Sequence, residues 1–330
     1  MSSARAVIFG CAGLSLGRSE AAFFAESQPW GAILFARNIE SPDQVRRLTD
    51  DLRTAVGRDM PVLIDQEGGR VARMRAPHWR DWMPALEQCE RARDPALAME
   101  LRGRMIAREL RAVGIDVNCA PLADIAQGDT HAILQNRCYG RSVGDVVAHA
   151  RAMADGLLRG GVLPVLKHIP GHGRATLDSH LDLPVIDAVK SELQGTDFAA
   201  FRALADLPLG MTAHLVFRDI DPEAPATQSP RMIGLIREEI GFQGLLMTDD
   251  ISMQALQGPV AARAEAALAA GCDLVLHCNG DLAEMQALAG VCPLLSGEGL
   301  ARSERALAMR AAPEAGGAEA LEAAFAEAMG

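Results

Sequence analysis

Short runs of apolar residues recur along this chain, and longer segments rich in Ala, Leu, Arg and Glu separate them. A short, nearly continuous apolar run is typical of a strand that is buried on both faces, as in a parallel sheet. The predicted strands are Ala6–Phe9, Gly31–Phe35, Pro61–Ile64, Val117–Ala120, Val162–Lys167, Gly210–His214, Gly244–Thr248 and Asp273–Leu276.

The segments between these runs have the composition of helices. Strand and helix therefore alternate, which indicates parallel strands joined by right-handed crossovers. Eight such strands favour a closed (β/α)8 barrel of the TIM type over an open doubly wound sheet. A dinucleotide-binding fold is disfavoured, because Gly10, Gly13 and Gly17 lack the GxGxxG spacing. The predicted helices are Pro42–Val56, Pro95–Val113, Val143–Gly160, Lys190–Leu204, Arg231–Ile240 and Pro259–Ala270.

The 330 residues are expected to form one domain over 1–330. A barrel of this kind uses about 250 residues and often more, so we assign it to residues 6–280. The Ala-, Glu- and Leu-rich remainder, 281–330, is predicted to be helical, with a link at 311–317 before the last helix. No internal repeat or long linker indicates a second domain.

The net charge and the cysteine content limit the partners and the cellular compartment that this protein fits. The net charge is −11 and Lys and Arg are scattered, which argues against nucleic acid as a partner. No apolar stretch is long enough to span a membrane, and the first apolar run resembles a strand rather than a signal peptide. A cytoplasmic monomer is expected. The odd number of cysteines, with no CxxC pair, predicts reduced thiols: Cys11, Cys89, Cys119, Cys138, Cys272, Cys278 and Cys292.

The segment 167–180, KHIPGHGRATLDSH, carries the densest polar chemistry and follows the apolar run Gly161–Leu166. Loops at the ends of buried strands hold the sites of many α/β enzymes. Three interpretations are open. The segment is a solvated loop with incidental histidines, a metal site, or a loop that binds substrate and transfers protons.

Two spacings within this segment bear on the choice. His168 and His172 are four apart, but a helix that would place both as metal ligands on one face is disfavoured by Pro170 between them. Asp178 and His180 are two apart, so an extended segment points both to the same side. A carboxylate beside an imidazole fixes its tautomer and stabilises the imidazolium, which favours proton transfer.

Polar residues also gather where the predicted strands end, and polarity on one end of a barrel marks its active face. A structural role is open for each residue, because Asp and Asn commonly cap the following helix. Asp250 and Ser252 fit a cap well, and for Asp249 a cap and a catalytic role are both open. The strand-end residues are Asp65, Gln66, Glu67, Lys167, His168, His214, Asp249, Asp250 and Asn279, with Arg70 and Arg73 close behind the third strand.

The sequence contains no P-loop, HExxH or CxxC pattern, so we expect a site without metal or cofactor. Carboxylates, histidines and basic donors together suit the hydroxyl groups of a sugar. Cleavage of a glycosidic bond needs a carboxylate near the anomeric carbon and a proton donor near the leaving oxygen. Asp249 and the Asp178–His180 pair can fill these roles.

Eight motifs, which occur in the family's order, resemble glycoside hydrolase family 3, in its bacterial single-domain β-N-acetylhexosaminidase branch. Together they cover the predicted barrel. The motifs are IDQEGGRVARM (Ile64–Met74), APLADI (Ala120–Ile125), NRCYG (Asn136–Gly140), KHIPGHGRATLDSH (Lys167–His180), MTAHLVF (Met211–Phe217), PATQSP (Pro225–Pro230), GFQGLLMTDDISM (Gly241–Met253) and AGCDLVLHCN (Ala270–Asn279).

The resemblance implies a role for each matched site residue. Asp249 aligns with the nucleophile, His180 with a histidine general acid/base and Asp178 with its partner. The implied reaction retains the anomeric configuration through a covalent glycosyl-enzyme. The residues implied to hold the terminal N-acetylglucosamine are Asp65, Arg73, Arg137, Lys167 and His168.

The resemblance also implies a substrate and a setting. The carbohydrate partner would be GlcNAc–anhydroMurNAc peptides, cleaved during peptidoglycan recycling in the cytoplasm. Four positions depart from the usual motifs, and we expect them to alter the pocket wall: Thr248, Ile169, Cys138 and His277.

Three alternatives stay open at the level of sequence. One is a catalytically silent sugar-binding barrel. Another is a metal-dependent hydrolase that uses His168, His172 and His180. The third, within the same family, is a β-glucosidase or a phosphorylase. Transfer to phosphate is conceivable because a neutral histidine repels phosphate less than a carboxylate does.

Overall fold

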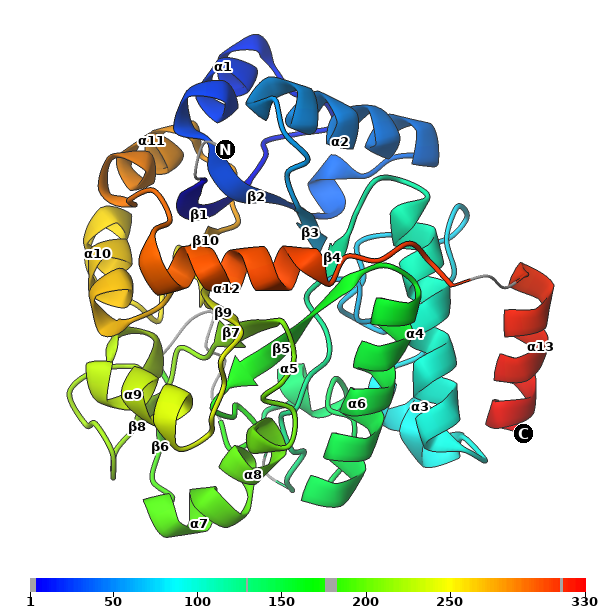
Figure 1. The fold of residues 1–330 in the computed structure, drawn as a ribbon. Helices are drawn as coiled ribbons and strands as arrows, with labels where there is room; N and C mark the ends of the chain where they lie inside the picture. Colours follow the sequence, from blue (N-terminus) through cyan, green and yellow to red (C-terminus); the bar gives the residue numbers. More distant parts are fainter. Residues whose placement is uncertain (1–3, 129, 176–182, 315–316) are drawn as a thin grey trace.

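Eight parallel strands close into a barrel at the centre of the molecule (Figure 1). The computed structural model describes residues 4–128, 130–175, 183–314 and 317–330. Each barrel strand pairs in parallel with its neighbours, and the last strand pairs with the first. The predicted (β/α)8 barrel is confirmed. In order around the barrel the strands are β1 (Arg5–Gly10), β2 (Pro29–Leu34), β3 (Val62–Ile64), β4 (Val117–Asn118), β5 (Leu163–Ile169), β7 (Leu209–Thr212), β9 (Leu245–Asp250) and β10 (Leu274–His277).

Most helices surround this barrel, and a small parallel pair, β6 (Val185–Ile186) with β8 (Val216–Phe217), lies outside it. The helices are α1 (Arg18–Ser27), α2 (Pro42–Val56), α3 (Ala85–Arg91), α4 (Pro95–Arg111), α5 (Ala132–Gln135), α6 (Val143–Arg159), α7 (Lys190–Gly195), α8 (Asp197–Arg202), α9 (Pro230–Glu238), α10 (Val260–Ala270), α11 (Leu282–Val291), α12 (Gly297–Ala308) and α13 (Ala318–Met329), with short 3-10 helices η1 (Ala36–Asn38) and η2 (Ala226–Gln228).

Local sequence explains where several helices begin and end. At α2 the Ser41 hydroxyl accepts a hydrogen bond from the Gln44 N–H, and Gly57 ends the helix with a φ of 68°. Only glycine adopts this left-handed conformation without a steric cost. Asp94 and Ser142 begin α4 and α6 with the same kind of side-chain cap.

One predicted helix, Lys190–Leu204, is two helices in the structure. The break falls at Thr196, whose backbone (φ −124°, ψ −97°) is not helical. The Thr196 hydroxyl donates to the Glu192 carbonyl oxygen, and the neighbouring Asp197 carboxylate is buried and accepts from Arg174 Nε at 2.7 Å. The prediction was wrong because composition alone did not reveal this buried ion pair, which fixes the chain at the break.

Helix α12 covers the end of the barrel at which the strands begin. Figure 1 shows it lying across the strands. Leu295 and Ala306 belong to the same apolar cluster as the inward-facing side chains of the barrel. The indole Nε1 of Trp30, at the start of β2, donates to Ser303 Oγ at 2.7 Å. The barrel is therefore closed at this end, and access to its interior is left to the opposite end.

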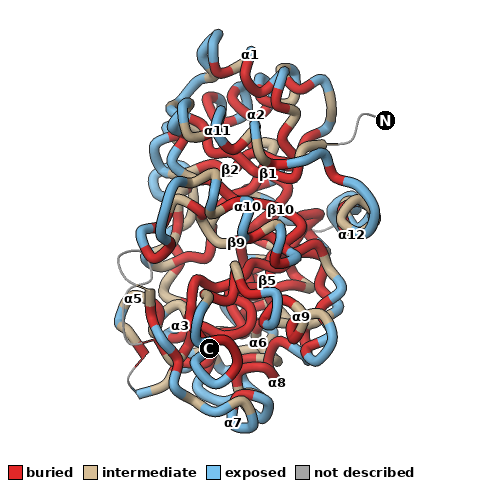
Figure 2. Tube along the Cα trace, turned by 90° about the vertical axis from the view of Figure 1, so that its left-hand side faces the viewer, coloured by how far each residue is buried: buried red, intermediate tan, exposed pale blue. Residues whose placement is uncertain are grey.

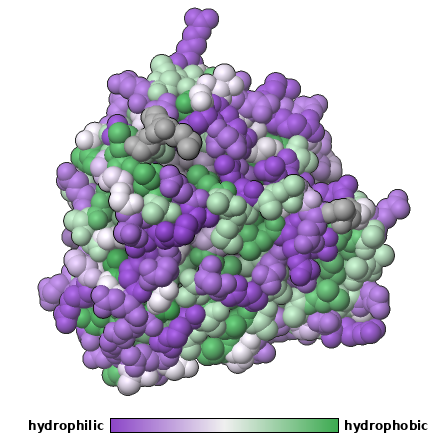
Figure 3. Space-filling view, viewed as in Figure 1, coloured by the Kyte–Doolittle hydropathy of each residue, from purple (hydrophilic) through white to green (hydrophobic). Residues whose placement is uncertain are grey.

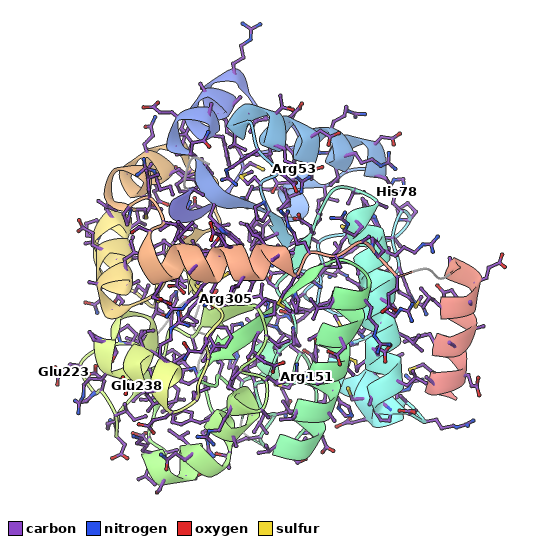
Figure 4. All side chains as sticks on the ribbon, viewed as in Figure 1. Arg53, His78, Arg151, Glu223, Glu238 and Arg305 are labelled. Carbon is purple, nitrogen blue, oxygen red and sulfur yellow. The ribbon has the colours of Figure 1, made fainter. Side chains whose placement is uncertain are left out.

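Ion pairs also stabilise the end of the barrel that α12 covers. Arg53, labelled in Figure 4, extends from α2 and forms an ion pair with Asp116, which precedes β4. Arg310, which follows α12, pairs with the same carboxylate at 2.7 Å. The face shown in Figure 3 is mostly hydrophilic, with hydrophobic residues in patches between. Among the described residues, no helix is long and apolar enough to cross a bilayer.

The last helix, α13, packs at the periphery against α4 (Figure 1). The Phe325 ring stands edge-on to Trp82, with centroids 5.4 Å apart, and the Asp94 N–H donates to the Ala328 carbonyl oxygen. The residues after the barrel therefore fold onto it as helices, as predicted.

The α4–α6 interface depends on close backbone approach at glycines. A Cβ at Gly156 would lie 2.1 Å from the Glu100 carbonyl oxygen, whereas a Cβ at Gly144, in the same helix, would meet nothing nearer than 3.9 Å. We predict that Gly156→Ala lowers the free energy of unfolding by about 1–3 kcal/mol, as overpacking does. Gly144→Ala is the matched control and should be neutral or slightly stabilising. Urea unfolding of both variants tests this, and equal stability of the two would contradict it.

Candidate active site

A pocket of about 280 Å³ lies where the barrel strands end. In Figure 2, α5 and α12 lie on opposite sides of the molecule, and α5 contributes Ile133 and Leu134 to the pocket. The pocket is therefore at the open end of the barrel, where enzymes of this fold carry their sites. Six of the eight predicted site residues line it: Asp65, Arg73, Arg137, Lys167, His168 and Asp249.

Five charged side chains form an alternating chain on one side of the pocket. Lys167 Nζ, at the centre, lies 2.9 Å from Asp65 Oδ1 and 2.6 Å from Glu67 Oε1. Arg73 Nη2 is 3.1 Å from the other Asp65 oxygen, and Arg137 binds both Glu67 oxygens at 2.8 and 2.9 Å. The order of charges is plus, minus, plus, minus, plus. Each carboxylate is thus held between two cations, which fixes its position.

Two opposing effects, burial and the neighbouring charges, determine the pKa values of these charged side chains. Burial would raise the pKa of the Asp65 carboxyl, but Lys167 and Arg73 hold it well below its usual range. For Glu67, burial is likewise outweighed by Arg137 and Lys167, and its pKa is lowered. Burial would lower the pKa of Lys167, but Asp65 and Glu67 raise it above its ordinary value. All three groups are therefore charged near neutral pH.

Asp124 organises the start of the KHIPGH segment. Its Oδ2 accepts from His168 Nδ1 at 2.7 Å, and its Oδ1 accepts from the His172 backbone N–H at 2.6 Å. Burial would raise the pKa of Asp124, but His168 lowers it below its usual range. A carboxylate can only accept, so Nδ1 of His168 carries the proton. Its Nε2 is left to interact in the pocket.

Asp249 stands near the end of β9 and faces the pocket. One of its oxygens accepts from the Asp250 N–H at 2.8 Å. Burial would raise the pKa of Asp249, but His168, His214 and this hydrogen bond hold it below its usual range. The side chain is therefore ionised, which is the form that a carboxylate nucleophile needs.

Asp250 does not cap a helix, contrary to the prediction. The residues after β9 form turns, and α10 begins only at Val260. The Asp250 carboxylate instead accepts from the backbone N–H and hydroxyl of Ser252 and from the Cys278 N–H. It thereby joins the end of β9 to the residue that follows β10.

None of the four departures from the usual motifs is among the residues that line the pocket, and the expectation that they alter its wall stays a prediction. Ile169 and Cys138 are buried in the hydrophobic core. His277 is buried and bonds Glu284 through Nε2 at 2.8 Å, away from the pocket. Thr248 Oγ1 accepts a backbone N–H from β10. Each serves packing or strand pairing.

The family assignment follows from comparison with known proteins. The sequence model described as the glycosyl hydrolase family 3 N-terminal domain matches residues 15–303, most of the chain. The chain belongs to glycosyl hydrolase family 3. The family match covers the barrel from α1 onward and every residue that lines the pocket.

Relatives within the family share most of the chain's length. A β-hexosaminidase from Alkalilimnicola ehrlichii is 39% identical over 281 residues, which are 83% of this chain and 80% of the relative. One from Methylococcus capsulatus is 39% identical over 277 residues, 82% of each chain. The structure is similar to that of NagZ from Neisseria gonorrhoeae in complex with N-trifluoroacetyl-D-glucosamine, with a TM-score of 0.87, 29% identity, and 99% and 98% of the two chains covered.

Two predicted residues of this family 3 site are outside the part of the chain that the structure describes, and two residues in the site had no predicted role. Asp178 and His180 lie outside the described residues, so their roles stay predictions. Glu67 was predicted at a strand end but was given no role in the site, and Asp124 was not singled out, although both lie within motifs that match the family. The signal for Glu67 was its spacing from Asp65, because residues two apart after a strand point to the same side.

The described residues contain no group of three His, Cys, Asp or Glu side chains placed to hold a metal ion. In the proposed metal set of His168, His172 and His180, His168 already bonds Asp124 through Nδ1. His180 is outside the described residues. Metal-free chemistry therefore remains a prediction for this site.

We predict that Asp124→Asn lowers kcat/KM by about a hundred-fold while the protein stays folded. An amide matches the shape of the carboxylate but can present an N–H to His168 Nδ1, and misplaced catalytic or binding groups cost about this factor. Steady-state kinetics over a pH range, with circular dichroism as the fold control, test this. Wild-type kinetics in the variant would refute it.

Acid should destabilise the fold through His172. Burial, and then the neighbouring His168, lower the pKa of His172 from 6.5 to about 4. Between these values the unfolded chain binds a proton that the folded chain does not, so the free energy of unfolding decreases as pH falls from about 6.5 to about 4. His172→Gln should weaken this pH dependence. Urea midpoints across the window measure it, and a midpoint that rises on acidification would contradict the prediction.

Proposed function

We propose that this protein is a retaining exo-β-N-acetylglucosaminidase that removes terminal N-acetylglucosamine from cell-wall fragments. That it is a β-N-acetylhexosaminidase, a glycoside hydrolase, follows from its family and its β-hexosaminidase relatives. The observation that carries the proposal is the pocket at the open barrel end. It holds an ionised Asp249 together with a chain of charged donors and acceptors.

The charged chain suits one terminal sugar. Lys167 has three N–H donors, and two point to carboxylates, which leaves one for a hydroxyl. Arg73 Nε is buried and has no hydrogen-bond partner among the described residues, so a sugar hydroxyl could satisfy it. Asp65 and the His168 Nε2 complete a set of donors and acceptors. A substrate without a matching hydroxyl would leave buried groups unpaired, which favours selectivity.

The proposed reaction has two steps. Asp249 attacks the anomeric carbon and the glycosidic bond breaks, so the sugar becomes an ester of the Asp249 carboxylate. His180, partnered by Asp178, gives a proton to the departing oxygen. It then takes one from the water that cleaves the ester, and the product keeps the β configuration. The assignments of His180 and Asp178 rest on the resemblance of their motif.

Wall fragments are proposed as the natural substrates. We infer that the pocket takes a chain end, as removal of one sugar at a time requires, and GlcNAc–anhydroMurNAc peptides present such an end. All seven cysteines are unpaired thiols. Free thiols persist in reducing compartments, which supports a cytoplasmic site of action.

Loss of the nucleophile should be partly reversible by a small anion. We predict that Asp249→Gly loses nearly all hydrolysis of an aryl β-N-acetylglucosaminide, because no glycosyl ester can form. Azide fits the space left by the carboxylate and attacks from the same side, so it should restore turnover and yield the α-glycosyl azide. NMR of the product identifies its configuration. Equal rescue in wild type, or a β-azide, would refute the assignment of Asp249.

The substrate claim is tested by a paired comparison. We predict that kcat/KM for the 4-nitrophenyl β-N-acetylglucosaminide exceeds that for the matched β-glucoside by on the order of a hundred-fold or more. The enzyme should also release N-acetylglucosamine from GlcNAc–anhydroMurNAc peptides with no requirement for phosphate. A preference for the glucoside, or no release from the wall fragment, would refute the proposal.

A further inference from the structure

A chain of hydrogen bonds runs through buried side chains next to the candidate nucleophile. Thr212, Thr227 and His214 are buried, with no more than 1% of any of them exposed. Thr212 Oγ1 lies 2.7 Å from Thr227 Oγ1, which lies 2.8 Å from His214 Nδ1. His214 Nε2 lies 3.0 Å from the carbonyl oxygen of Asp250, the residue after Asp249. Apolar side chains would fill this space without the cost of burying polar groups, so the chain indicates a role beyond packing.

The direction of these hydrogen bonds follows from the His214 ring. Burial lowers the pKa of His214 below its ordinary value, so the ring is neutral near neutral pH and carries one proton. The Asp250 carbonyl oxygen can only accept, which places this proton on Nε2. Nδ1 then accepts from the Thr227 hydroxyl, because the other carbonyl acceptor of that hydroxyl, Ala213, is farther away at 3.1 Å. Thr227 thus selects the tautomer in which His214 donates to Asp250.

His214 contacts Asp250 beyond the point where the backbones of two neighbouring strands pair. Strands β7 and β9 are parallel, and the last residues in register are Met211 and Met247. Three positions farther along each segment, the donor to the β9 side is the His214 side chain. The Asp250 carbonyl oxygen also accepts from the Met253 N–H, so it is held by two donors. The imidazole therefore extends the contact between β7 and β9 to the residue beside the nucleophile candidate.

Asp250 in turn orients the carboxylate of Asp249. The Asp250 N–H donates to Asp249 Oδ1 at 2.8 Å. The Asp250 carboxylate accepts from Ser252 and from the Cys278 N–H, and its carbonyl group is held by His214. The donor to Asp249 therefore belongs to a residue that is fixed through both its side chain and its backbone. A carboxylate attacks through one oxygen, so a fixed hydrogen bond to the other oxygen sets the direction of attack.

His214 is not among the residues that line the pocket, so it acts through Asp250 and not on the sugar. We propose that His214, in the tautomer that Thr227 selects, is a positioning residue for the nucleophile. It holds the Asp250 carbonyl group, and the Asp250 N–H thereby stays directed at the Asp249 carboxylate. This inference rests on the proposed function and adds to it the residues that orient its nucleophile.

The test compares variants that keep or remove the donor. His214→Phe fills the space of the ring without an N–H, and kcat/KM for the aryl β-N-acetylglucosaminide should fall by about ten-fold, the effect of one hydrogen bond. His214→Gln should recover part of this loss, because its amide can donate to the same carbonyl oxygen. Thr227→Val keeps the shape of the side chain but removes the hydroxyl that selects the tautomer, so it should also lower kcat/KM.

Two measurements separate positioning from general damage to the protein. The inhibition constant of N-acetylglucosamine, whose binding needs no attack, should stay at the wild-type value in every variant. The acid limb of the pH profile of kcat/KM should move to higher pH in His214→Phe, because loss of His214 and a less well-directed Asp250 N–H both raise the pKa of Asp249.

Thr49→Val is the matched control, because Thr49 is a buried threonine on α2 whose hydroxyl donates to the Val113 carbonyl oxygen, and it does not line the pocket. This variant should unfold at a lower temperature than wild type, while its kcat/KM and acid limb stay unchanged. A loss of stability alone therefore does not imitate the expected kinetic effect.

The outcomes separate this inference from the proposed function. Wild-type kcat/KM in His214→Phe, or an equal loss in His214→Phe and His214→Gln, would refute the role of His214 and leave the glycosidase assignment intact. Weaker binding of N-acetylglucosamine that accounts for the whole loss would refute it too. If His214→Phe does not fold, wild-type kcat/KM in Thr227→Val refutes the proposal. A wild-type protein that cleaves no aryl β-N-acetylglucosaminide contradicts the proposed function itself, and this inference fails with it.

Discussion

The site depends on the ammonium group of Lys167, which lies buried between the carboxylates of Asp65 and Glu67. A buried cation is stable only when paired, and removing one partner of such a pair leaves an uncompensated charge. The two carboxylates in turn hold Arg73 and Arg137. One lysine thus links four other charged groups, and their ion pairs fix this side of the pocket before any substrate enters.

The barrel supplies this arrangement by bringing separate parts of the chain to one end. Lys167 and His168 come from β5, Asp65 follows β3 and Asp249 lies near the end of β9. The opposite end is closed by α12 through Trp30 and the inner apolar cluster. Packing at one end leaves the other free for polar side chains, whose burial is compensated by mutual pairing rather than by water. The end of the barrel that α12 closes therefore stabilises the fold, and the opposite end carries the candidate site.

Hydrophobic patterning predicted the barrel because buried parallel strands are short, apolar and separated by helices. It could not predict the break at Thr196 or the shape of the turn after β9, since both depend on contacts with distant residues: Asp197 with Arg174, and Asp250 with Cys278. Six of the residues that line the pocket were predicted from strand ends and from the matching motifs. The roles of Glu67 and Asp124 were not predicted, because these residues hold Arg137, Lys167 and His168, and a sequence does not display such pairings.

The central claim is that this pocket holds one N-acetylglucosamine while Asp249 bonds to its anomeric carbon. A fluorinated N-acetylglucosaminyl substrate with a good leaving group, which slows breakdown of the glycosyl-enzyme, allows a direct measurement by mass spectrometry of the intact protein and its peptides. The account predicts one added sugar per chain, bound to the peptide that contains Asp249. An adduct on another residue, or turnover of the probe with inversion and no adduct, would contradict it.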